Sequence, residues 1–304
     1  VMPDGKIRAR GVAMAMQGSS ISNCDVGSVT VKLSDEGTYH ITVGCTDMGT
    51  GCDTIIAQFA ADVLETPIDN ISVYGVDTDI SPYDSGSYAS STTYLTGMAA
   101  VKACEQLRER IIALAAVRMN KDASALTFDG ENVIDESDGA KMSLFDIATA
   151  SMCNNEISLE VTYSHSSPVS PPPFMAACAE IEADPETGAI ELLDYTACVD
   201  CGTVVNTNLA RVQTEGGLLQ GIGMALYEDV WYDERGKNLS NSFMQYKVPS
   251  RLDTDRIRVE FDSSYEPTGP FGAKSIGEIV INTPAPAIAD AVYNATGVWI
   301  DELP

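Results

Sequence analysis

The sequence is poor in histidine, tryptophan and basic residues. Its 304 residues include two histidines, two tryptophans and 18 lysines and arginines, against 44 aspartates and glutamates. The net charge of −26 at pH 7 repels phosphate backbones and anionic lipids, so we expect no nucleic acid and no membrane among the partners. Backbone N–H groups can still hold a single anionic ligand locally. With His40 and His165 alone available, a histidine-rich metal site has little support, and a Ser–His–Asp triad would have to use one of them.

Long apolar runs and clustered cysteines are also missing. No stretch approaches the roughly 18 apolar residues that span a bilayer, and Val1–Lys6 holds no apolar signal-peptide stretch. The start at Val1 suggests a trimmed or partly ordered chain. The eight cysteines are scattered, too sparse for a disulfide scaffold and not grouped as an iron–sulfur centre requires. We therefore expect a reduced, cytoplasmic protein.

Apolar residues make up 44% of the chain, which is ample for a sizeable core. At about 150 residues per domain the length predicts two domains. The proline-rich segment 166–173 favours extended backbone, and we expect it to connect a first subdomain (1–165) to a second (166–304); it could equally be a rigid surface loop. Hairpins with intervening helices predict the α+β class, with two α/β subdomains of mixed sheets and helices.

Periodicity places the individual elements. Alternating apolar residues predict a β-hairpin over 29–43, and the apolar stripe Val12–Met16 is expected in the core. Helical spacing predicts five helices, at about 53–64, 96–119, 144–150, 208–227 and 284–294. Further strands are predicted at 71–76, 157–163, 176–183, 189–199 and 257–261.

Two loops are candidates for ligand binding. Thr46–Asp53 joins a predicted strand to a predicted helix, and its Gly-x-Gly would let the backbone approach a phosphate or a pterin edge at the helix N-terminus. Asp84–Thr93 offers six Ser and Thr hydroxyls before the long helix, which could donate to an anion without adding charge. Each could equally be ordinary: a plain turn in the first case and a capped, solvated loop in the second.

Two further segments could carry polar chemistry. Gln220 lies among the glycines of Gly216–Gly223, where it could bind an oxo group or a cofactor amide; the glycines could instead serve close helix packing. Glu278 precedes an apolar stretch, and burial would make its carboxylate a usable base near neutral pH. An exposed loop glutamate is the commoner alternative.

The order of these motifs along the chain resembles the molybdenum hydroxylases of the xanthine oxidase family, in the C-terminal half of their molybdenum-binding region. The resemblance runs from about Arg10 to Ala295. Its most specific matches are Val199–Gly202, Asn206, Gln213, Gly216–Gly217, Gln220–Gly223 and Gly277–Glu278. The N-terminal half of the region, with its Gly-Gly-x-Phe-Gly segment, is absent. The chain therefore resembles enzymes that divide the region over two chains, as nicotinate dehydrogenases do with their medium molybdopterin subunit.

The resemblance implies a role for each matching residue. Glu278 would be the general base. The cofactor-binding residues would be Gly49, Thr50, Gly51, Ser87, Ala89, Ser90, Ser91, Thr93, Gln220 and Gly221, with Gln220 near the oxo or sulfido group of the metal. Thr50 stands where the family usually has glutamine, which implies a different contact to the pterin amine. The molybdenum would be held by the pterin dithiolene and not directly by the protein.

The resemblance also implies the reaction and the partners. The cofactor would be molybdopterin, expected as the cytosine dinucleotide, with a sulfido or selenido ligand on molybdenum. The chain would hydroxylate a carbon of a small N-heteroaromatic substrate with oxygen from water, nicotinate to 6-hydroxynicotinate being the expected reaction. The expected partners are a second molybdopterin subunit, an FeS subunit and an FAD-containing flavin subunit. The alternatives are a part of a xanthine or purine dehydrogenase, and a scaffold subunit that holds the cofactor without catalysis.

Overall fold

The computed structural model describes residues 1–153, 157–250, 252–253 and 256–304. Its contacts divide the chain into two compact units that interleave in sequence. Unit 1 comprises Val1–Gly18, Pro172–Tyr265 and Ile276–Pro304, and unit 2 comprises Ser19–Pro171 and Glu266–Ser275. The change of unit after Pro171 falls inside the proline-rich segment, while the first 18 residues join the second half of the chain.

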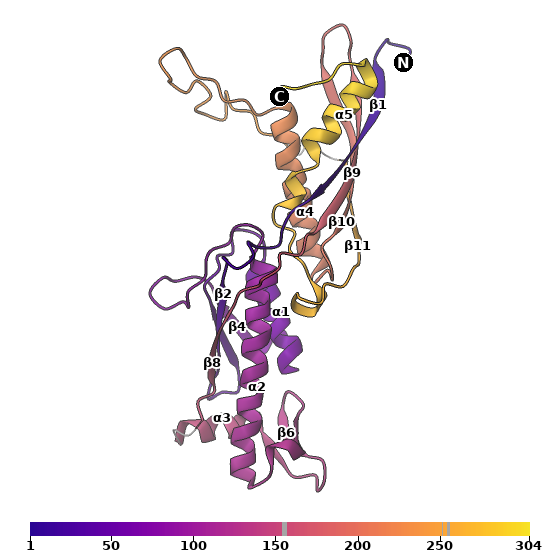
Figure 1. Ribbon diagram of the computed structural model, residues 1–304. Coiled ribbons are helices and arrows are strands. Elements are labelled where there is room, and N and C mark those ends of the chain that lie inside the picture. Colours follow the sequence, from indigo (N-terminus) through magenta and orange to yellow (C-terminus); the bar gives the residue numbers. More distant parts are fainter. Residues whose placement is uncertain (154–156, 251, 254–255) are drawn as a thin grey trace. The chain divides into compact units, whose positions relative to one another are not determined.

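Unit 1 is a four-stranded sheet with helices α4 (Thr207–Leu226) and α5 (Pro284–Thr296) along one face (Figure 1). The strand order is β1 (Ile7–Met16), β9 (Phe174–Ala183), β10 (Ile190–Asp200) and β11 (Ile257–Asp262). The first two pairs are antiparallel, and β10–β11 is parallel because α4 forms the crossover between them. Alternate residues of each strand, such as Ala179, Ala197 and Val259, point into the core under the helices.

Helix α5 packs directly on β1 at Gly11. A Cβ on Gly11 would lie 2.1 Å from the backbone nitrogen of Ala291, so no larger residue fits there. This close packing helps to hold β1, the first strand of the chain, at the edge of a sheet whose other strands come from the second half.

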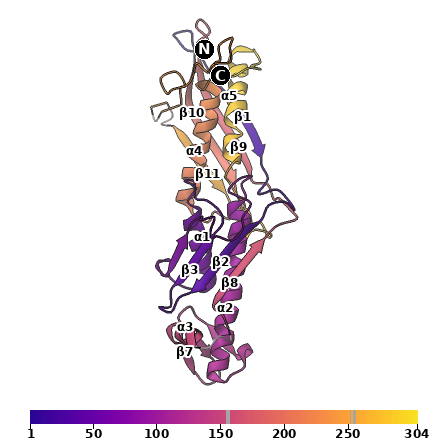
Figure 2. The ribbon, with the colours of Figure 1, turned by 90° about the vertical axis from the view of Figure 1, so that its left-hand side faces the viewer.

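Unit 2 is also a four-stranded sheet with two helices, α1 (Cys52–Leu64) and α2 (Gly97–Met119), on one face (Figure 2). Its strand order is β4 (Ile71–Tyr74), β3 (Tyr39–Val43), β2 (Gly27–Leu33) and β8 (Glu160–His165). A second, three-stranded sheet and a helix complete the unit: β5 (Leu126–Phe128), β6 (Asn132–Asp135), β7 (Lys141–Ser143) and α3 (Leu144–Cys153). One-turn elements lie at Ile68–Asn70, Thr92–Thr96, Ala123–Ala125, Pro270–Gly272 and, in unit 1, Ile279–Ile281 (η5).

The two four-stranded sheets share one topology. In unit 2 the antiparallel hairpin β2–β3 is followed by α1, the parallel strand β4 and then α2. In unit 1 the hairpin β9–β10 is followed by α4, the parallel strand β11 and then α5. The fourth strand, β8 or β1, pairs antiparallel with the first strand of its hairpin. The chain thus builds the same arrangement twice, although no repeat is visible in the sequence.

Most predicted elements are confirmed, including the hairpin over 29–43 and the five helices. The prediction that Val12–Met16 lies in the core is wrong for three of its five residues. Ala13 and Ala15 pack against the core, but Val12, Met14 and Met16 are 67%, 83% and 67% exposed. The stripe is a strand, so successive side chains alternate between the two faces of the sheet. Among the described residues, no helix has the length and apolar character to cross a membrane.

Candidate functional site

Glu278 lies in unit 1, immediately before the one-turn helix η5 (Ile279–Ile281). Its side chain is partly buried, and its Oε2 accepts a hydrogen bond of 2.8 Å from Nε2 of Gln17, the residue that follows β1. The preceding carbonyl, that of Gly277, accepts a 3.1 Å hydrogen bond from Nε2 of Gln213 on α4. Two glutamine side chains from different elements therefore hold the Gly277–Glu278 segment.

Helix α4 is rich in glycine because it packs tightly against the segment that follows Glu278. A Cβ on Gly217 would lie 2.1 Å from Cγ2 of Val280, and a Cβ on Gly221 would lie 2.6 Å from Cγ of Pro284. Gly216, on another side of the helix, has nothing within 4 Å. Of the two explanations for these glycines, close packing accounts for Gly217 and Gly221. Gln220 is exposed on α4, so it is not a buried carboxamide within this chain.

The Thr46–Asp53 loop lies in unit 2, between β3 and α1. The Asp47 carboxylate organises it, since its Oδ1 accepts from the backbone nitrogens of Gly49 at 2.9 Å and Gly51 at 3.1 Å. Both glycines adopt left-handed backbone (φ 104° and 76°), which favours glycine. Nothing lies within 4 Å of a Cβ built on Gly49, so the space above this backbone is open. Thr50 is half-buried between them.

The start of helix α1 carries acidic groups that oppose an anion. Ligand atoms of Asp47, Cys52 and Asp53 lie within 4.8 Å of one another. Burial raises the pKa of Asp53, and the neighbouring Asp47 carboxylate raises it further. A phosphate at this helix N-terminus would meet that negative charge, whereas the N–H and amine groups of a pterin would meet acceptors. Of the two ligands considered from sequence, the loop favours the pterin edge.

The hydroxyl-rich loop also lies in unit 2, between β4 and α2, with Ser90 and Ser91 buried. Ala89 and Ser90 both have left-handed backbone (φ 50° and 53°), an uncommon conformation for residues with side chains. Such local strain persists only where the surroundings enforce it, and it is concentrated at functional sites. A π-helical turn, Thr92–Thr96, which includes Thr93, leads from this loop into α2.

A side-chain contact ties the two loops of unit 2 together. The Ser87 hydroxyl donates to the Thr46 carbonyl and accepts from the Thr46 backbone nitrogen, both at 2.9 Å. Unit 1 has a corresponding contact where its parallel strands end: Oδ1 of Asp200, the last residue of β10, accepts from the Ser264 hydroxyl at 2.6 Å and from the Gly202 nitrogen at 2.9 Å. The structure thus joins the Thr46–Asp53 loop to the hydroxyl-rich loop through Ser87 in unit 2, and brings Glu278, Gln213 and Gln17 together in unit 1.

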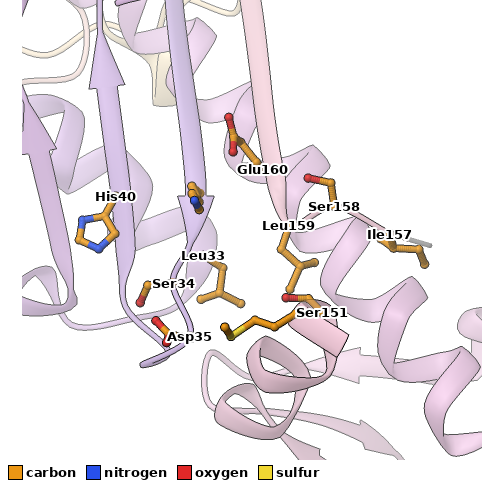
Figure 3. A pocket seen from close by; sticks show the side chains of 11 residues that line it. Leu33, Ser34, Asp35, His40, Ser151, Ile157, Ser158, Leu159 and Glu160 are labelled. Atoms are coloured by element: carbon orange, nitrogen blue, oxygen red, sulfur yellow. The ribbon is translucent and has the colours of Figure 1, made fainter. Parts of the chain in front are cut away.

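A separate hollow of about 770 Å³ opens on unit 2 beside the strand ends of β2 and β8 (Figure 3). Its walls include Lys32, His40 and Glu160, which occupy matched positions on neighbouring strands. None of the predicted site residues lines it.

Comparison with known proteins identifies the family. The model of the molybdopterin cofactor-binding domain matches residues 2–255. The chain belongs to this family. It is therefore part of a molybdenum-binding region of the xanthine oxidase type, as its motifs predict.

Three relatives illustrate the similarity. The chain is 38% identical to the "probable hypoxanthine oxidase" of Escherichia coli strain K12, over 96% of this chain and 31% of that protein. It is 31% identical to the gamma subunit of the 6-hydroxypseudooxynicotine dehydrogenase complex of Paenarthrobacter nicotinovorans, over 99% of this chain and 39% of that protein. Quinoline 2-oxidoreductase of Pseudomonas putida 86 has the same fold, with a TM-score of 0.87 and 26% identity, over 97% of this chain and 40% of that chain. The chain thus spans about a third of the length of the curated relatives.

Gln17 is the residue of this site that the motifs did not single out. A signal was present, because Gln17 lies between an apolar strand and a glycine, much as Gln220 lies among apolar residues and glycines. The pairing of Gln17 with Glu278 joins positions 261 residues apart, which no local pattern predicts.

Proposed function

We propose that this chain is a catalytic, molybdopterin-binding part of a molybdenum hydroxylase that acts on a small N-heteroaromatic compound, with Glu278 as the general base. The observation that carries the proposal is the placement of Glu278: partly buried, with one carboxylate oxygen oriented by Gln17 in a chain of the molybdopterin-binding family. A positioned base of this kind contributes about 10²–10⁴-fold to a rate.

The residues present fit the proposed cofactor. Nothing lies within 4 Å of a Cβ built on Gly49, so the backbone there is open to a ligand, and the acidic start of α1 suits a pterin edge better than a phosphate. Gly49, Thr50 and Gly51 would hold the pterin, and Ser87, Ala89, Ser90, Ser91 and Thr93 would bind the pterin and its phosphates through neutral N–H and O–H donors. Gln220 and Gly221 would also bind the cofactor, with Gln220 near the oxo or sulfido group of the metal. The cytosine dinucleotide form and a sulfido or selenido ligand belong to the proposal.

When bound, the molybdenum centre supplies the two-electron oxidation that turns R–H and water into R–OH, two protons and two electrons. Glu278 accepts one of those protons at its carboxylate, and Gln17 holds that carboxylate in place. Iron–sulfur and flavin groups, which we place on an FeS subunit and a flavin subunit, would take up the two electrons. The names of the relatives, a hypoxanthine oxidase and a quinoline oxidoreductase, support an N-heteroaromatic substrate. Nicotinate is our first choice, and a purine is the alternative.

We also propose a second molybdopterin-binding portion as a partner, since the chain corresponds to 31% of a relative's length. The exposed apolar side chains on the open face of β1, among them Met14 at 83%, support such a contact. Without it we expect the chain to be unstable or free of cofactor. The cysteines with described side chains form no disulfide, which suits the reducing cytoplasm that we propose as the location.

The test is Glu278→Gln in the purified complex, with molybdenum content measured in the same samples. Glutamine keeps the shape of the side chain but cannot accept the proton, so we expect turnover to fall by about 10²–10⁴-fold at unchanged molybdenum content. Near-normal turnover of the variant on nicotinate and purines would refute the proposed role. A wild-type complex that holds molybdopterin but oxidises none of these substrates would favour the scaffold alternative.

A further inference from the structure

We infer that Gln17 is a positioning residue for Glu278, and that Asn282 sets the orientation of the Gln17 carboxamide. The inference rests on the proposed function of Glu278. It assigns a task to the residue at the end of β1, which lies far from the Gly277–Glu278 motif in sequence.

The geometry begins with a chain of two hydrogen bonds. Nε2 of Gln17 donates to Oε2 of Glu278 at 2.8 Å, and Nδ2 of Asn282 donates to Oε1 of Gln17 at 3.3 Å. An amide can present either its N–H or its carbonyl to a neighbour, and the neighbours decide which. A carboxylate on one side and an amide N–H on the other both favour the orientation seen here.

The carboxamide of Gln17 also bridges the two ends of η5. Glu278 is the residue before this single turn and Asn282 the residue after it. The backbone of Gln17 is itself held, because its nitrogen donates to the Pro173 carbonyl at 3.4 Å where β1 meets β9. The sheet edge therefore anchors a side chain that spans the turn carrying the proposed base.

This anchoring has a direct consequence for a general base. A glutamate side chain has three rotatable bonds, and proton transfer requires its oxygen within hydrogen-bond reach of the reacting group. Small misplacements of reacting groups, of about 1 Å, can lower a rate by about 10²-fold. Gln17 restricts the rotation of the carboxylate without contacting the reacting atoms.

The first test is Gln17→Leu in the holoenzyme complex, alone and combined with Glu278→Gln. We expect the single variant to lower kcat by about 10–100-fold, with KM changed by less than about threefold and molybdenum content unchanged. Since Gln17 acts only through Glu278, the double variant should be no slower than Glu278→Gln alone. Gln106→Leu, at a similarly half-buried glutamine on α2 in unit 2, is the matched control and should retain normal turnover.

The second test changes neither Gln17 nor Glu278. Asn282→Asp replaces the N–H donor with a carboxylate, which favours the reversed amide and turns the Gln17 carbonyl toward Glu278. We expect kcat to fall by about 10-fold or more, whereas Asn282→Ala, which removes the donor without adding an acceptor, should have a smaller effect. A crystal structure of the cofactor-free complex that carries Asn282→Asp provides a readout besides activity, and should show the Glu278 carboxylate moved from its wild-type position.

The outcomes separate this inference from the proposed function. If Glu278→Gln is inactive while Gln17→Leu keeps wild-type kcat, the positioning role is wrong and the base remains. If the two single losses multiply in the double variant, Gln17 acts independently of Glu278 and the inference fails. If Glu278→Gln is fully active, both proposals fall. An unmoved Glu278 in the Asn282→Asp crystal structure would refute the role given to Asn282.

Discussion

The two units have the same strand and helix topology but differ in what their equivalent segments carry. In unit 2 the segment between the parallel strand β4 and α2 holds the strained Ala89–Ser90 loop with its neutral hydroxyl donors. In unit 1 the segment between the parallel strand β11 and α5 holds Glu278. Ligands commonly bind beyond the carboxyl ends of such strands. We propose that this one arrangement serves cofactor binding in unit 2 and proton transfer in unit 1.

The open faces of the two sheets differ as well. The face of the unit 2 sheet away from α1 and α2 carries polar residues such as Lys32 and Thr30, whose hydroxyl lies 2.8 Å from that of Thr162. The same face in unit 1 exposes Val12, Met14 and Met16. A polar open face suits water, and a contiguous apolar one marks a contact with another protein surface. The comparison predicts that changes in unit 1 affect turnover and assembly, and that changes in the unit 2 loops affect cofactor content.

Among the changes that compare the two units, the largest effect is expected at Gly217 of unit 1. In Gly217→Ala the new methyl group would meet Val280 at 2.1 Å, so η5 and the adjacent Glu278 must shift. We expect turnover to fall by about 10–100-fold and stability by about 1–3 kcal/mol. Enzyme assays and urea unfolding measure both. Gly216→Ala on the same helix meets nothing within 4 Å and should stabilise the protein by up to about 1 kcal/mol at normal turnover. Equal activities of the two variants would contradict the packing argument.

The next effect concerns the unit 2 loop. Gly49 and Gly37 both have left-handed backbone and open space where an added methyl group would lie, so alanine at either position should cost about 1 kcal/mol of stability. Only Gly49 lies in the proposed pterin loop. We therefore expect Gly49→Ala, and not Gly37→Ala, to lower the molybdenum content of the purified complex several-fold. Parallel metal analyses decide this, and equal molybdenum in both variants would remove the loop from the proposed site.

A smaller effect is expected from the open face of unit 1. Met14→Lys places a charge in the proposed contact, while Met244→Lys changes an equally exposed methionine, 80% against 83%, on the segment between α4 and β11. We expect Met14→Lys to co-purify with less of the partner, the second molybdopterin-binding portion. Met244→Lys should co-purify with the normal amount. Equal recovery would show that the apolar face of β1 is not the contact.

The sequence predicts these elements well where the signal is local. The α2 helix and the hairpin over 29–43 follow from residue spacing alone, and the order of the glycine, serine and Gly-Glu motifs indicated the family. Contacts between residues distant in sequence could not be predicted from the sequence. The interpretation of Val12–Met16 as core failed because a strand that joins residues 174–183 of the later half has one face covered and one open. Gln17 was missed for the same reason, since its function depends on where β1 docks.

The smallest expected effect is a difference between the two units in how their stability depends on pH. Both histidines lie in unit 2, and partial burial lowers the pKa of His165 below its ordinary 6.5, with the nearby charge of Lys102 lowering it further. Between that lowered value and 6.5 the unfolded chain binds more protons than the folded one, so His165 makes unit 2 less stable as pH falls through this window. The loss should stay below about 1 kcal/mol, because the side chain is only partly buried and solvent screens its charge.

Hydrogen exchange at pH 7 and pH 5.5, corrected for intrinsic rates, should show weaker protection at low pH for the unit 2 core. His165→Gln should remove that difference and leave unit 1, which has no histidine, unchanged. A pH response that persists in the variant would assign it to other groups.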